Sequence, residues 1–197
     1  MKLISTDVDS TSWTTDGKQG YWHAVGFGSK TMSSPDIIMC QYLHTGTAKP
    51  ASFQCIDTKS TSEVRPVSDA QQDVTTVNST ATFRTSGSST LVTLEATFDR
   101  LLATNDTKDQ TLTPGSTINS VWARGKMTSG LSQEHAGSQR GAWTIAVQTP
   151  PTIETIVNSN GTTTTVVEPA KDNSFSVTLS SLVNVILFGI LNTLYWL

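Results

Sequence analysis

SSTLVTLEATF, residues 88–98, has the clearest structural pattern in the chain. Its apolar residues Val92, Leu94, Ala96 and Phe98 alternate with polar ones. Successive side chains of a β-strand point to opposite faces of the sheet, so this alternation predicts a strand with one face buried and the other in solvent. Such strands are typical of antiparallel sheets that pack one face on a core.

The residues on either side of this stretch repeat the strand pattern. Further apolar runs of similar length are separated by glycine, proline and small polar residues, which favour turns. They are GYWHAVGFG (20–28), PDIIMCQYL (35–43), SFQCID (52–57), TINSVWARG (117–125) and GAWTIAVQT (141–149). Residues 1–20 are polar, and we expect them to begin as a loose strand containing Trp13. Short strands at this spacing, without an amphipathic helix before residue 150, predict an all-β fold, an antiparallel immunoglobulin-like β-sandwich over residues 1–148.

The composition argues against one class of function. The 197 residues carry a formal net charge of −3 and no cluster of Lys and Arg, so the chain offers no basic surface to nucleic acid. The length is sufficient for one domain with appended segments.

Three Asn-x-Ser/Thr sequons favour an extracytoplasmic location. They begin at Asn78, Asn105 and Asn160, in stretches that we interpret as polar loops, where glycosylation occurs in secreted proteins. The first 20 residues contain no apolar core of a signal peptide. We therefore expect either a cytosolic chain or a natural start upstream of Met1, and the apolar C-terminal segment favours the second.

Residues 149–175 and 176–197 differ in composition from the preceding domain. The first segment is rich in Thr and Pro and predicts a disordered stalk. The second has no charged residue and predicts a hydrophobic helix long enough to span a bilayer. A GPI-attachment signal, with Asn173 or Asp172 as the attachment residue, and a tail anchor both fit this pattern. We expect attachment at the extracellular face of the plasma membrane.

The two cysteines are too few for a disulfide scaffold or a thiolate metal cluster. Cys40 and Cys55 lie equally far from the centre of the 44–51 turn, so they face each other if that turn joins two antiparallel strands symmetrically. A cross-strand disulfide is then feasible and would stabilise the fold by roughly 3 kcal/mol for a loop of this size. Two buried free thiols are the alternative in a cytosolic chain.

The chain lacks the motifs of several enzyme classes. It has no HExxH motif, no GxSxG nucleophile turn and no CxxC pair. Met32 lies among polar residues in a turn, and His135 lies in a Ser/Gly-rich loop. A thioether and an imidazole are a suitable axial pair for haem iron. Taken singly, a core-filling Met32 and a solvated His135 are the simpler interpretations.

Three blocks of the sequence resemble the DOMON family. GYWHAVGFGSKTMSSPDIIMC (20–40) is similar to the first family block, and FDRLLATNDTKDQTL (98–112) is similar to the middle segment. VWARG at 121–125, followed by His135 and by Arg140-Gly141, is similar to the last block. The blocks occur in the family's order and the resemblance covers roughly residues 20–148.

This resemblance implies a β-sandwich and a choice between two kinds of site. Some family members bind b-type haem through one Met and one His, which match Met32 and His135. Other members lack the ligands and act as ligand-binding, sugar-binding or interaction modules. For the haem-binding case we expect Arg140 and Arg100 to face the haem propionates, since guanidinium groups pair bidentately with carboxylates. The alternative is that both arginines are cations on the protein surface.

These features together predict a membrane-anchored domain that relays single electrons. Two axial ligands leave no open position on the iron, so such a site favours electron exchange over bond chemistry, and we do not expect an enzyme. The chain has no reductase module of its own, so a redox partner protein or a small reductant such as ascorbate would supply the electrons. A haem-free recognition module on the cell surface is the second hypothesis.

Overall fold

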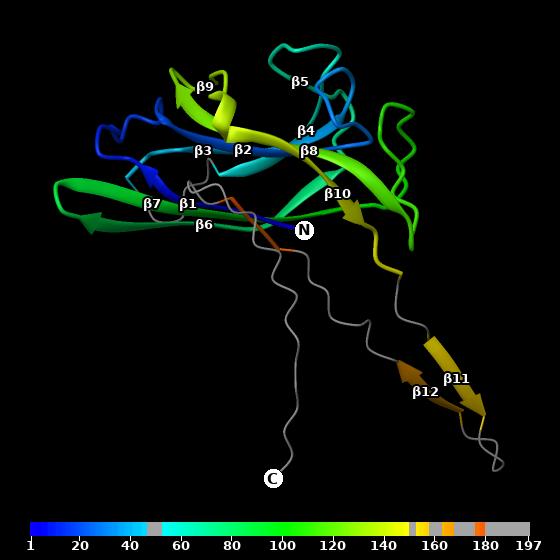
Figure 1. The fold of residues 1–197 in the computed structure, drawn as a ribbon. Helices are drawn as coiled ribbons and strands as arrows, with labels where there is room; N and C mark the ends of the chain where they lie inside the picture. Colours follow the sequence, from blue (N-terminus) through cyan, green and yellow to red (C-terminus); the bar gives the residue numbers. More distant parts are fainter. Residues whose placement is uncertain (47–52, 150–152, 158–162, 168–175, 180–197) are drawn as a thin grey trace, which may run out of the picture.

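The computed structural model describes residues 1–46 and 53–149, together with the backbone of 153–157, 163–167 and 176–179. The described part is an all-β sandwich in which two sheets face each other (Figure 1). Its helical content is limited to a single 3-10 turn, η1 (Gly137–Gln139). The predicted β-sandwich is therefore confirmed, whereas its immunoglobulin-like topology stays a prediction.

The first sheet has four strands and lies on one side of the sandwich. Their order across the sheet is β13 (Ser176–Leu179), β1 (Lys2–Asp9), β7 (Ser89–Arg100) and β6 (Val74–Ser86). Neighbours are antiparallel except for β1 and β13, which pair in parallel.

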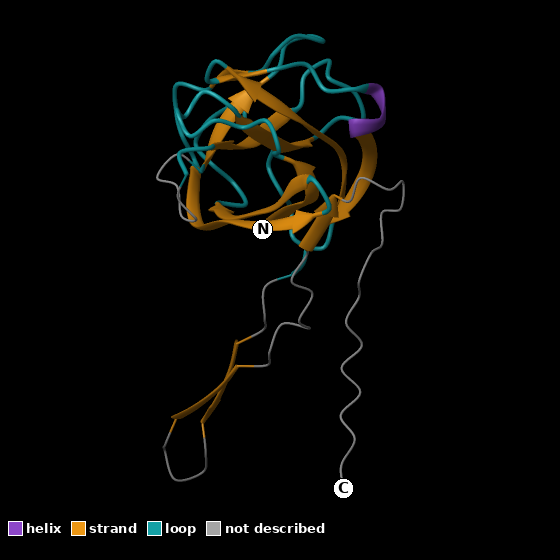
Figure 2. Ribbon diagram, turned by 90° about the vertical axis from the view of Figure 1, so that its left-hand side faces the viewer, coloured by secondary structure: helices purple, strands orange, loops and turns teal. Residues whose placement is uncertain are grey.

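The second sheet has seven strands, all antiparallel, and curls over the first (Figure 2). Its order is β10 (Arg140–Ala146), β8 (Thr117–Thr128), β2 (Gly20–Phe27), β3 (Asp36–Leu43), β4 (Gln54–Lys59) and β5 (Val67–Ser68), with β9 (Leu131–Ser132) paired to β8. Strands that adjoin in sequence mostly adjoin in space, but β8 returns to pair with β2.

The core between the sheets confirms the alternation in residues 88–98. Val92, Leu94, Ala96 and Phe98 of β7 are at most 1% exposed and pack against the inner face of the second sheet. Apolar area removed from water contributes about 25 cal/mol per Å². The apolar core between the two sheets is therefore the main source of the free energy of folding.

Strand β2 is buried along its whole length, on both faces of its sheet. Tyr21, His23 and Val25 share the inner face, as their alternation predicts, while Trp22 and Ala24 belong to a separate apolar cluster on the outer face. An antiparallel strand with both faces buried needs a cover on each side. The four-stranded sheet covers the inner face, and loops cover the outer one.

His23 is a polar residue within the inner core. Its Nδ1 lies 3.0 Å from the Ser5 hydroxyl oxygen, and its ring is 5.9 Å from that of Phe53. Burial, together with the nearby Arg124 guanidinium, lowers the pKa of His23 to about 3. The imidazole is therefore neutral in the folded protein near pH 7.

The N-terminal strand and strand β6 differ from the sequence predictions. The strand occupies Lys2–Asp9, and Trp13 lies in the turn that follows it, with its ring 5.8 Å from that of Tyr42. Strand β6 was not predicted, because it is rich in Thr and Ser and has no run of buried apolar residues. Asn78 lies in this strand, exposed and next to a register shift, rather than in a loop. Asn105 lies in an exposed loop, as expected.

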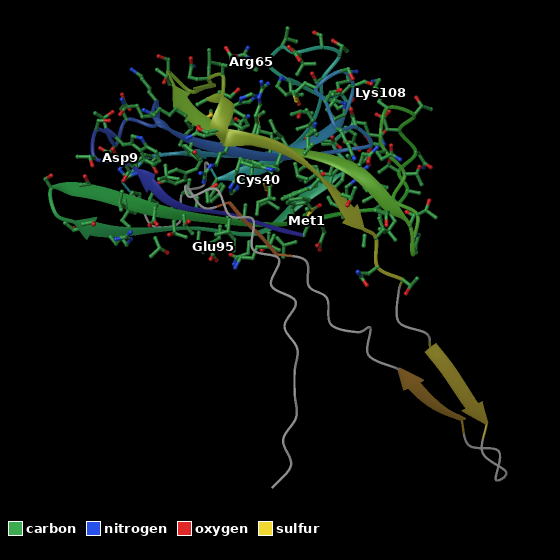
Figure 3. The ribbon with its side chains drawn as sticks, viewed as in Figure 1. Met1, Asp9, Cys40, Arg65, Glu95 and Lys108 are labelled. Carbon is green, nitrogen blue, oxygen red and sulfur yellow. A yellow bond between two sulfur atoms is a disulfide. The ribbon has the colours of Figure 1, made fainter. Side chains whose placement is uncertain are left out.

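The predicted cysteine pairing is confirmed. Cys40 on β3 and Cys55 on β4 are register partners and form a disulfide in the inner core. Figure 3 shows Cys40 between the two sheets. The described residues contain no free cysteine.

The segment after residue 149 is described only in part. Two short strands, β11 (Ile153–Val157) and β12 (Thr163–Val167), form an antiparallel ribbon within the predicted stalk. The predicted C-terminal helix begins at residue 176, where the structure has β13; the remainder of that helix, Asn160 and Asn173 lie outside the described residues. No helix in the described part of the chain is both long and apolar enough to cross a membrane.

Candidate functional site

A cavity of about 740 Å³ lies on the outer face of the seven-stranded sheet. Strands β2, β3 and β8 form its floor, and residues of β10 flank one side. Loop segments 30–32, 63–66 and 132–137 form the rest of the wall. The volume is within the range of sites for small molecules and cofactors, roughly 300–1,000 Å³.

Small side chains on the floor leave room for this cavity. Ala24 on β2 pairs in register with Ala123 on β8, so the two strands present short side chains at the same level. Gly26 differs, because its neighbours fill the space above it: a Cβ atom there would lie 2.8 Å from Cγ2 of Val121 and 3.0 Å from Cβ of Pro35. Ile37 and Met39 of β3, together with Trp22, complete an apolar floor.

Met32 lies in the loop between β2 and β3 and lines the cavity. The loop begins at Gly28, whose φ of +86° is readily accessible to glycine alone. Hydroxyl groups bond within the loop: the Thr31 N–H donates to the Ser29 hydroxyl at 3.0 Å, and the Thr31 and Ser33 hydroxyls lie 2.7 Å apart. Met32 is half-buried and packs against the outer apolar cluster, so its thioether is held at the wall.

His135 lies in the loop after β9 and lines the same cavity. Its ring is 6.3 Å from that of Trp22, which donates from Nε1 to the Gln133 carbonyl at 3.0 Å and so ties this loop to β2. The Nδ1 atom of His135 is buried and has no hydrogen-bond partner in the described part of the chain. A buried nitrogen without a partner is costly, so it indicates an absent partner such as a ligand or water.

The donor set of the cavity fits a b-type haem. A thioether and an imidazole, the predicted axial pair, come from two loops on a shared apolar floor. Arg140, at the start of β10, also lines the cavity and is exposed, where a propionate would meet solvent. Of the four predicted haem-binding residues, the structure thus brings Met32, His135 and Arg140 to one site.

Arg100, the fourth predicted residue, has a different position. Its side chain is only 4% exposed and does not line the cavity. It donates to Asp36 at 2.6 Å and to Asp109 at 3.3 Å, and its guanidinium lies 5.4 Å from the Phe27 ring centroid. The expected propionate contact is therefore replaced by a buried ion pair, because β7 directs Arg100 between the sheets.

The charged residues of the cavity wall were not among the residues predicted from the sequence. Lys30, Glu63, Arg65 and Glu134 all line the cavity. Figure 3 shows Arg65 on the side of the molecule opposite Glu95, which lies on the four-stranded sheet. The polar segment around Arg65 has no periodicity, so only its contact with the cavity identifies it.

The profile of the DOMON domain matches residues 4–125, more than half of the chain. The chain belongs to the DOMON domain family. The match runs from β1 into β8 and includes Met32, and it ends before His135 and Arg140. The family includes haem-binding domains and domains with other interaction roles, and DOMON domains are typically extracellular. A search of curated proteins found no match to this chain.

Proposed function

We propose that this DOMON domain is an extracellular, membrane-attached b-type haem domain that relays single electrons. The observation that carries the proposal is the position of Met32 and His135, which are distant in sequence and line the same cavity above its apolar floor. The chemistry of the two side chains supports it, since a thioether and an imidazole are both ligands of haem iron.

The residues of the cavity suit a cofactor that exchanges electrons. When bound, haem would supply reversible one-electron chemistry at its iron. Met32 and His135 would hold the iron, and a thioether and imidazole pair favours electron exchange over the binding of small-molecule substrates. Arg140 and Arg65 would neutralise the propionates near solvent. The apolar floor of Ala24, Ala123 and Met39 would keep water from the macrocycle.

The cellular setting in this proposal has its own support. The Cys40–Cys55 disulfide is typical of an oxidising compartment, and family members are typically extracellular. The uncharged segment 180–197, which follows β13, would attach the chain to the membrane as a tail anchor. A GPI anchor at Asn173 is the alternative, and its attachment would remove β13 from the mature chain. A redox protein or a small reductant such as ascorbate would supply electrons.

A visible spectrum tests the haem proposal. The full chain is produced in secreting eukaryotic cells with haem available, purified in mild detergent, and measured before and after dithionite. We expect a Soret band with sharp reduced α and β bands, as for low-spin, six-coordinate iron. Met32→Ala and His135→Ala should each shift or abolish these bands.

His44→Ala is the matched control, because His44 lies against Tyr42 and Phe83 and does not line the cavity. Its spectrum should equal that of the unchanged chain. A folded, colourless protein would overturn the haem proposal. It would favour a haem-free module that recognises a sugar or another ligand, for which the charged wall around Trp22 offers hydrogen-bonding groups.

A further inference from the structure

A second chemical centre lies at the end of the sandwich core, away from the cavity. Three carboxyl groups meet there: Asp36 at the start of β3, Asp57 on β4 and Asp109 in the loop between β7 and β8. Each offers one oxygen, and these three oxygens lie within 4.8 Å of one another. Two oxygens that ligate one Ca²⁺ at 2.3–2.6 Å are less than about 5.2 Å apart, so the spacing suits a shared calcium ion.

The charge of this cluster is incompletely balanced. Arg100 donates to Oδ2 of Asp36 and to Oδ2 of Asp109. One guanidinium facing three carboxylates leaves a formal charge of −2, and buried uncompensated charge is strongly unfavourable. The cluster therefore needs further positive charge in its fully ionised state.

Two oxygens in this cluster lack partners. Oδ1 of Asp36 and Oδ2 of Asp57 are buried and accept no hydrogen bond among the described residues. Asp57 as a whole is 1% exposed and Asp36 is 5% exposed. Buried carboxylate oxygens are normally hydrogen-bonded or bound to a cation, so these two atoms indicate an additional partner.

We propose that Asp36, Asp57 and Asp109 form a calcium site. An all-oxygen set of carboxylates is the donor type that Ca²⁺ prefers. Ca²⁺ suits it better than Mg²⁺, which retains several water molecules and demands octahedral geometry that a buried cluster accommodates poorly. The site does not use the haem-binding residues, and the inference is independent of the proposed electron transfer.

Calcium binding would fix the positions of two loops, the one that contains Met32 and the one between β7 and β8. Asp36 directly follows the Met32 loop, and it accepts from the Gln110 N–H at 2.8 Å. Thr104 donates to Asp109 at 2.8 Å within the loop between β7 and β8. A cation at this position would therefore join the two loops to β4 through Asp57.

Thermal unfolding of the full chain, with 5 mM CaCl₂ or with EDTA at pH 7.5, tests this site. For a site with a Kd of roughly 0.1–1 mM, typical of extracellular modules, we expect Ca²⁺ to raise Tm by about 3–8 °C. MgCl₂ at the same concentration should give a smaller shift. Asp57→Asn should abolish the Ca²⁺ shift, because an amide cannot supply the anionic oxygen.

Asp99→Asn is the control, since it removes the same charge from an exposed position of β7. It should keep the full Ca²⁺ shift. No shift in the unchanged chain, or an equal shift in Asp57→Asn, would overturn the calcium site. Equilibrium dialysis of the unchanged chain against Ca²⁺ gives a second test that needs no variant: about one ion per chain supports the site, and none at 10 mM overturns it.

Discussion

The two faces of the seven-stranded sheet are built by the same strands and have different roles. On the inner face, Val25 and Tyr42 meet Phe98 and Leu94 of the opposite sheet and are buried by direct packing. On the outer face, Ala24 and Met39 are almost as well buried, yet they lie beneath a cavity. Burial alone therefore does not separate a structural face from a binding face; the size of the side chains and the element that covers them do.

Truncation of a side chain on the inner face should have the largest effect. Phe98→Ala should lower the free energy of unfolding by about 3–5 kcal/mol, because it removes a ring that is 1% exposed from a close-packed interior. Leu131→Ala, at a position 52% exposed on β9, should change it by less than about 0.5 kcal/mol. Urea denaturation measures both. Similar losses in the two variants would show that the inner face is not the main source of stability.

Enlargement of an alanine should distinguish the two faces directly. Ala96→Leu on the inner face should cost about 1–3 kcal/mol, since Ala96 is fully buried among packed neighbours. Ala123→Leu points into the cavity, and in protein prepared without haem it should cost less than about 1 kcal/mol. With haem supplied, Ala123→Leu should reduce the Soret absorbance. Equal destabilisation by the two changes would mean that no usable space exists above the sheet.

The pH dependence of stability should report on His23 of the inner face. Its pKa falls from 6.5 to about 3 on folding, so the unfolded chain binds more protons between these values. This contribution to stability is fully present above pH 6.5 and is lost as the pH falls. From pH 6.5 to 5.5 the loss should be about 1 kcal/mol, and His23→Gln should remove it. Urea midpoints of the two proteins across this range measure the difference, and parallel curves would contradict the prediction.

The sequence predicts a strand where alternating apolar residues mark a buried face. It does not predict a strand that buries few of its side chains. Val92 to Phe98 alternate because one face of β7 meets the core, and the cysteine pairing follows from the symmetry of a hairpin. Strand β6 is outermost in its sheet and only Ala81 is fully buried along it, so its sequence resembles a polar loop.

The sequence predicts the two candidate iron ligands of the site. It does not predict the residues that form the cavity wall around them. Met32 and His135 place a thioether and an imidazole in otherwise polar loops. The family resemblance implies that the two residues belong to one haem site. The sequence does not distinguish Arg100 from Arg140. The fold shows that Arg140 lines the cavity and that Arg100 instead pairs with Asp36. Arg65 reaches the cavity through a loop whose path follows no local pattern in the sequence.

The parallel pairing of β1 with β13 has a practical consequence for handling the protein. Residues 176–179 hydrogen-bond along one side of β1, although nearly the whole chain separates the two strands. A shortened protein that stops before residue 176, made to remove the apolar terminus, would leave amide and carbonyl groups along Lys2–Ser5 without a strand partner. An open strand edge of this kind templates pairing between molecules and promotes aggregation. The solubility gained by removing the apolar segment would thus be offset by intermolecular β-pairing, and trimming is safer from residue 180 onward.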